Sequence, residues 1–84
     1  MIVSTLSQYP GKVVKEDLGV VYAWDNSLEF GRHIYNSDES YQRALEQLIK
    51  KAEKLNANAI LGMNFSFSAD SSIIILMGTA VILE

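Results

Sequence analysis

Hydrophobic residues fill both sides of the alternation in the last segment of the chain, from Ile73 to Leu83. Successive side chains of a strand point to opposite faces of its sheet, so this segment is apolar on both faces. One face carries Ile73, Ile75, Met77, Val81 and Leu83, and the other carries Ile74, Leu76, Ala80 and Ile82. A strand with this pattern needs apolar cover on each side.

A helical period is clearest in the middle of the chain. Apolar residues recur at alternating spacings of four and three at Tyr41, Leu45, Leu48, Ala52 and Leu55. This spacing is one stripe of an amphipathic helix. Ser37 or Asp38 is suited to cap its first turn. Asn56 or Asn58 is suited to the left-handed conformation that ends a helix.

Two further segments have strand patterns before the helix. Residues 2–7 are rich in β-branched side chains, and residues 12–24 alternate. Pro10 and Gly11 suit the two central positions of a type II turn between them. Gly19 interrupts the second segment, so one long strand and two short strands with a kink are both open.

After the helix, residues 59–68 alternate as a strand, with Leu61, Met63, Phe65 and Phe67 on one face. Residues 69–72 are polar and predict a turn into the last strand. The order ββ(β)–α–ββ predicts a single α+β domain over residues 1–84, with one helix on an antiparallel sheet.

The helix covers one face of such a sheet, and the other face needs a second source of cover. We expect a neighbouring copy of the chain to supply it, with Ile74, Leu76 and Ile82 at the contact. Three large aliphatic side chains left in water would each forfeit about 1.5–3 kcal/mol. The alternative is that residues 25–37 fold back over this face, and the two explanations can coexist.

Composition supports self-association. The chain has only 84 residues and no cysteine, so disulfides and thiolate metal sites cannot stabilise it. A net charge of −3 argues against a nucleic-acid partner. The sequence shows neither a basic leader nor an apolar run long enough to span a membrane. We therefore expect a cytoplasmic homo-oligomer with no membrane partner.

Four stretches resemble the YbjQ-like family, in the same order along the chain. They read GKVVKEDLGVVYA, FGRHIYNSDESYQRAL, LNANAILGMNFSF and GTAVILE. The chain departs from the family pattern at Asn56, where glycine is usual, and at Phe30, which replaces the first of a glycine pair. The stretch between Trp24 and Gly31 is also short.

The resemblance implies a small α+β subunit, built like the dodecin subunit and assembled into a pentameric ring. The family carries a heavy-metal-binding label, so a divalent metal is the candidate cofactor that the resemblance implies. The biochemical role of the family is otherwise unknown.

Candidate binding residues are few. His33 is the sole histidine; it is either a metal ligand, repeated around a ring axis, or an exposed loop residue. Arg32 suits an anion or an acidic partner at a subunit interface. Trp24 and Tyr22 could stack on a flat ligand, as in dodecin-type cofactor storage, or belong to a core or interface.

The acidic residues predict solvated surface, since Glu16, Asp17, Asp25 and Asp70 lack the spacing of a hard-metal loop. The sequence has no nucleophile or phosphate-binding motif, and we assign no catalytic residue. The prediction is a non-enzymatic homo-oligomer that binds a metal or small ligand. Dodecin-type cofactor binding is the alternative, and an intersubunit active site at Arg32 and His33 stays open.

Overall fold

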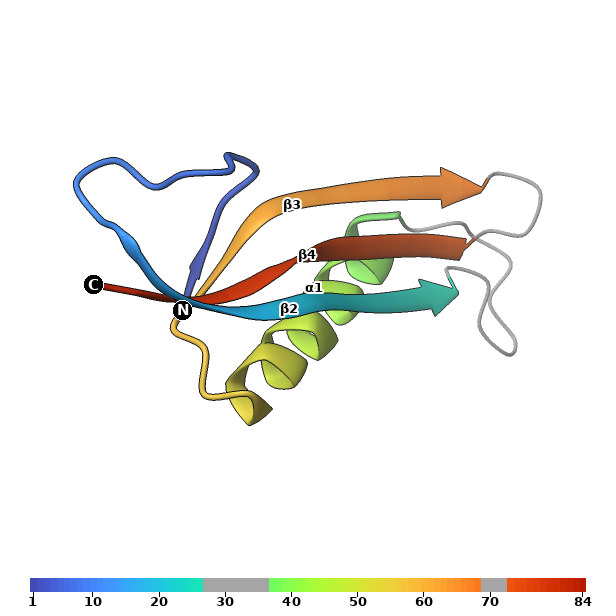
Figure 1. The fold of residues 1–84 in the computed structure, drawn as a ribbon. Coiled ribbons are helices and arrows are strands. Elements are labelled where there is room, and N and C mark those ends of the chain that lie inside the picture. The colour runs from blue at the N-terminus through green and yellow to red at the C-terminus, as the bar shows by residue number, and fades with distance from the viewer. Residues whose placement is uncertain (27–36, 69–72) are drawn as a thin grey trace.

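The computed structural model of the chain describes residues 1–26, 37–68 and 73–84. Along the chain these residues form β1 (Ile2–Val3), β2 (Val14–Asn26), α1 (Ser37–Lys54), β3 (Ala59–Ser68) and β4 (Ile73–Leu83). Figure 1 shows α1 lying against one side of the sheet. The predicted α+β class and the predicted order of elements are confirmed. The predicted turn at residues 69–72 lies outside the described residues.

The sheet is mixed, which corrects the prediction of an antiparallel sheet. Its strand order is β1-β3-β4-β2. β4 pairs antiparallel with both β2 and β3, but β1 pairs parallel with β3. β1 and β2 therefore lie at opposite edges of the sheet although they are neighbours in sequence. Hydrophobic alternation indicates which face of the sheet a side chain occupies but not which strand lies next to it, so the sequence could not reveal that β1 pairs with β3.

β2 is a single long strand with two irregularities. Its register to β4 shifts between Val14 and Glu16 and again between Asp17 and Gly19. Gly19 has a φ of 101°, and its N–H donates to Asp17 Oδ1 at 2.8 Å. Of the two alternatives for this segment, the long strand is the one observed. The register shift at Gly19 is the bulge that the glycine was expected to allow.

The helix buries Ala44, Leu48 and Ala52 completely, with Tyr41 and Leu45 packed beside them. Leu55, predicted as part of the same stripe, follows the helix and is 42% exposed. Asn56 adopts the left-handed conformation, with a φ of 65°. The Asn56 N–H donates to Glu53 O and the Ala57 N–H donates to Ala52 O, which is a Schellman ending.

The core between helix and sheet contains Val21 and Ala23 of β2 together with Ile74 and Leu76 of β4. Ile74 and Leu76 were predicted to face a neighbouring copy, and this is corrected because both are buried against α1 within one chain. Ile82, the third residue of that prediction, is half-buried. The large β4 residues exposed on the opposite face are Ile75 and Met77.

The face away from the helix is covered in part by the N-terminal segment of the same chain. Ile2 and Tyr9 pack there against a second cluster, formed by Ala59, Leu61, Val81 and Leu83. Neither explanation offered from the sequence foresaw this cover. The alternative was that residues 25–37 fold back over this face, and residues 27–36 of that segment lie outside the described residues.

A bulge in β3 changes which side chains share a face. The register to β4 shifts between Leu61 and Asn64, and Gly62 has a φ of 63°. Leu61 therefore belongs to the second cluster, whereas Met63 lies in the helix-side core. The prediction that the two share one face is wrong, because the extra residue between them reverses the alternation.

Candidate functional site

The face opposite α1 carries a group of exposed apolar side chains, here called the exposed strip. Its members alternate on two paired strands and are 39–67% exposed: Val20, Tyr22, Trp24, Ile75 and Met77. Tyr22 is in register with Met77, and Trp24 with Ile75. Side chains opposite each other on one face are in contact range, so the strip is continuous across β2 and β4.

Polar residues border the strip on one side. Asn64 and Ser66 of β3 are in register with Met77 and Ile75 and are exposed. On its other side the strip reaches β2, the end of the sheet order. Contiguous exposed apolar residues with a polar border are typical of an interaction surface.

Lys51 of α1 covers the backbone edge of β2 beside the strip. Its Nζ donates to Tyr22 O at 2.6 Å and lies 4.6 Å from the centre of the Tyr22 ring. The ammonium group thus satisfies an edge carbonyl and makes a cation–π contact. The Lys51 side chain lies over this carbonyl and hinders the approach of a further strand, so Lys51 protects this part of the edge.

The second feature of the same face is the segment of residues 4–13, here called the N-terminal arch. It projects from the end of the sheet where β2 begins (Figure 1). Gly62 N–H donates to Leu6 O at 2.8 Å at one foot. Val13 and Glu84 exchange backbone hydrogen bonds at the other. Lys12 N–H donates to Tyr9 O, and Gly11 has a φ of 79°, which confirms the predicted type II turn.

The arch encloses an open groove of about 790 Å³, lined by residues 6–14. A smaller cavity of about 230 Å³ adjoins it and shares Ser7 and Val14. Thr79 lines this cavity and is in register with Val20, the first residue of the exposed strip. The groove and the strip therefore follow one another along the same face.

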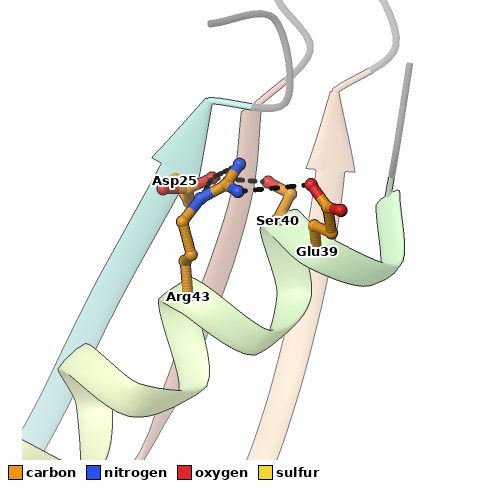
Figure 2. A network of polar contacts seen from close by, with 4 residues as sticks. All are labelled: Asp25, Glu39, Ser40 and Arg43. Carbon is orange, nitrogen blue, oxygen red and sulfur yellow. Dashed lines mark hydrogen bonds and ion pairs between the residues drawn. The ribbon is translucent and has the colours of Figure 1, made fainter. Parts of the chain in front are cut away.

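A polar network joins β2 to the first turns of α1, as Figure 2 shows. Asp25 Oδ2 accepts hydrogen bonds from Ser40 Oγ at 2.9 Å and Arg43 Nε at 3.0 Å. Arg43 Nη2 lies 2.8 Å from the same oxygen, and Arg43 Nη1 lies 3.8 Å from Glu39 Oε2. Asp25 was predicted as solvated surface, but its side chain is only 12% exposed. The network therefore connects the end of β2 with the beginning of α1, the two elements that flank residues 27–36 in the sequence.

Two of the predicted binding residues lie in the part of the chain that the structure describes, and two lie outside it. Tyr22 and Trp24 lie on the exposed strip, close enough in sequence and face to act together. Arg32 and His33 lie outside the described residues. In the described ranges, no group of three or more His, Asp or Glu side chains could hold a metal, and the chain has no cysteine. The described residues therefore contain no such group of metal ligands within one chain.

The family model that matches residues 27–84 is that of YbjQ, described as "Putative heavy-metal-binding". Proteins named UPF0145 from Thermotoga maritima and Thermotoga petrophila are 36% and 34% identical to the chain. Each match covers 100% of the chain and 98% of the relative. The chain belongs to the YbjQ-like family. A UPF0145 protein of Pseudomonas putida is 30% identical over the full length of both proteins.

The fold of the family is also found in a solved structure. A crystal structure of a protein of unknown function from Pediococcus pentosaceus, assigned to the DUF74 family, matches with a TM-score of 0.76. It is 22% identical and covers 100% of this chain and 98% of that one, so it supports the fold alone. No helix in the described ranges is long and apolar enough to cross a membrane.

This YbjQ-like chain is shorter than the relatives to which it is similar. The Thermotoga maritima match extends over 104 positions, whereas the chain has 84 residues. The relative therefore contains residues that have no counterpart here. The family resemblance is strong enough for the fold, but a function housed in those residues does not transfer to this chain.

Sequence reasoning missed the arch groove, the Asp25 network and the contact of Lys51 with Tyr22. The apolar residues Leu6 and Val13, which flank the polar turn at Pro10 and Gly11, were the only local signal of the groove. The other two features join residues 18 and 29 positions apart. No local pattern marks such pairs.

Proposed function

We propose that the protein functions as a homo-oligomer that binds a metal or small ligand and is not an enzyme. The observation that carries the proposal is the exposed strip on the face opposite α1. The family resemblance implies five copies in a ring, and we adopt that number as part of the proposal. We also expect the assembly to be cytoplasmic and to bind no nucleic acid.

The energetics of the strip favour a partner. Complete burial of a large apolar side chain is worth about 1.5–3 kcal/mol, and the five strip residues are roughly half exposed. Their burial would contribute several kcal/mol, comparable with the lower estimates of about 4 kcal/mol for the cost of association. A stable assembly therefore needs the partner surface to be apolar as well.

Association through the sheet face is favoured over addition of a strand at the edge formed by β2. Lys51 covers the backbone of β2 at Tyr22. Two register shifts and the charged run from Lys15 to Asp17 interrupt the same edge further along. Bulges and charges of this kind are the usual protection against edge pairing.

The test is the mass of the protein in solution. Size exclusion coupled to light scattering at micromolar concentration should give a multiple of the 9.4 kDa chain mass. Trp24→Glu should lower this mass, because burying a new carboxylate against a neighbour is unfavourable. A wild-type protein that elutes as a clean monomer would contradict the proposal.

Dodecin-type cofactor binding is the second candidate. It is supported by the exposure of Tyr22 and Trp24 at alternate positions of one strand, where two rings present a surface for a flat ligand. Such a ligand would be held between subunits. Purified protein should then absorb in the visible range if the ligand is a flavin, and native mass spectrometry should report its mass. Colourless protein without added mass speaks against this candidate.

Metal binding depends on His33, repeated in each copy of a ring. We expect His33→Ala to abolish binding of zinc, copper or nickel, measured by calorimetry on the intact oligomer. Equal affinity in wild type and variant would remove His33 from the proposal. An intersubunit active site at Arg32 and His33 would instead appear as turnover in a substrate screen that is lost in Arg32→Ala.

A further inference from the structure

Met77 is the residue of the exposed strip whose side chain contains an oxidisable sulfur atom. The chain has three methionines and no cysteine. Met77 is 44% exposed and Met1 is 47% exposed, whereas Met63 is only 7% exposed and lies in the helix-side core. An oxidant must reach the sulfur atom, so exposure decides which methionine reacts. Met1 and Met77 are therefore the accessible sites, and of these Met77 belongs to the strip.

Met77 lies in the middle of the sheet face opposite α1. Its strand, β4, is placed between β3 and β2. Met77 is in register with Tyr22 on one side and with Asn64 on the other, and both of these residues are exposed. Side chains opposite each other on one face have Cβ atoms about 4.5–5.5 Å apart. A change of polarity at Met77 therefore falls between the aromatic part of the strip and its polar border on β3.

We propose that Met77 is a redox-sensitive switch of self-association, in which hydrogen peroxide oxidises its thioether to a sulfoxide and the oxidised strip binds a neighbouring copy less tightly. The switch rests on the proposed self-association and adds its regulation. The thioether sulfur attacks one oxygen of the peroxide, so that an S–O bond forms and the O–O bond breaks. The sulfur loses two electrons, and the second oxygen leaves with both protons as water.

The oxidation product removes apolar character from the centre of the strip. Conversion of methionine to its sulfoxide turns a flexible apolar side chain into a polar one and disrupts apolar contacts. The polar border at Asn64 and Ser66 would then extend across β4 and leave a smaller apolar surface. In a separate chain water can donate hydrogen bonds to the sulfoxide oxygen. Against an apolar neighbour that oxygen loses them, which is unfavourable.

Self-association should in turn protect Met77. A neighbouring copy that covers the strip also excludes the oxidant, so separate chains present Met77 to peroxide and assembled chains do not. The rate of oxidation at Met77 should therefore fall as the protein concentration is raised through the range in which copies associate. Met1 lies outside the strip and is equally exposed, so its rate is the internal reference for the same sample.

The experiment adds hydrogen peroxide to the full chain and follows two quantities. Peptide mapping by mass spectrometry measures the sulfoxide at each methionine, and light scattering measures the mass of the assembly. Met77 should oxidise about tenfold faster than buried Met63. Oxidised protein should associate about tenfold more weakly. Circular dichroism verifies that the fold is retained, and methionine sulfoxide reductases should restore the original mass.

Two variants make the test specific to this side chain. Met77→Leu conserves the volume and has no sulfur, so peroxide should leave its assembly unchanged. Met77→Gln introduces a polar side chain and should weaken association without peroxide. Dissociation of peroxide-treated Met77→Leu, or wild-type association of Met77→Gln or of the fully oxidised protein, would overturn the switch while self-association stands. A wild type that is monomeric before peroxide is added would overturn the proposed function, and the switch with it.

Discussion

At the scale of single residues, Gly78 shows how closely β3 and β4 approach each other. Its position on β4 faces the β3 bulge, because the register passes from Leu61–Thr79 to Asn64–Met77 around it. A Cβ atom on Gly78 would lie 2.6 Å from Ile60 Cγ2 and 3.3 Å from the Leu61 carbonyl oxygen. Glycine is therefore required here by packing rather than by its φ angle.

Gly78→Ala should lower the free energy of unfolding by about 1–3 kcal/mol, the usual range for overpacking a filled core. Urea denaturation measures the change. Ile60→Ala removes the methyl group that an alanine would meet, so the double variant should be less destabilised than the sum of the single changes, by about 0.5 kcal/mol or more. Additive effects would show that the clash with Ile60 is not the cause.

At the scale of elements, the Asp25 network fixes the position of β2 against α1. The Asp25 carboxylate accepts hydrogen bonds from the hydroxyl of Ser40, which is buried, and from the guanidinium of Arg43, whose side chain is 29% exposed. Removing the carboxylate leaves both donors in a partly dry environment without this acceptor. The network is a contact between elements and appears only once they have packed.

Asp25→Ala should therefore lower the free energy of unfolding by about 1.5–3 kcal/mol, the range for hydrogen bonds to a charged group. Glu39→Ala is the matched control, because it also removes one carboxylate near Arg43. Glu39 is half exposed and its ion pair with Arg43 is 3.8 Å long, so the loss of that ion pair should cost roughly 0.3–0.5 kcal/mol. Equal losses in the two variants would contradict the importance assigned to Asp25.

At the scale of the whole molecule, the chain combines an apolar face with a β2 edge that is covered at Tyr22. Lys51 places its ammonium group on the β2 backbone at Tyr22, next to the exposed strip. An unprotected edge beside an apolar face promotes uncontrolled strand addition. In the proposed assembly, this contact leaves the sheet face rather than the β2 edge as the surface for association.

Lys51→Met should speed aggregation of the protein on heating, because the carbonyl of Tyr22 becomes available to another strand. Thioflavin T fluorescence and light scattering at a fixed temperature follow the process. Lys50→Met is the control, since it removes the same charge from the neighbouring exposed position on α1. Equal aggregation rates in both variants would mean that net charge, and not edge protection, is responsible.

The sequence predicted much of the fold and less of the site. The helical stripe from Tyr41 to Leu55 and the alternation of residues 59–68 and 73–83 located α1, β3 and β4. Tyr22 and Trp24 were identified as a pair, and the structure places both on the exposed strip. The faces of β4 were assigned the wrong way round, because alternation separates two faces without indicating which one meets the helix.

By itself, the sequence determined the periods, the turns and the excess of apolar sheet surface, since these depend on neighbouring residues along the chain. Only the tertiary structure decided that β1 crosses to β3, that Ile74 and Leu76 face α1, and that the arch covers part of the second face. These outcomes depend on contacts between residues far apart in sequence. Their free energies arise from packing in three dimensions, which no local pattern records.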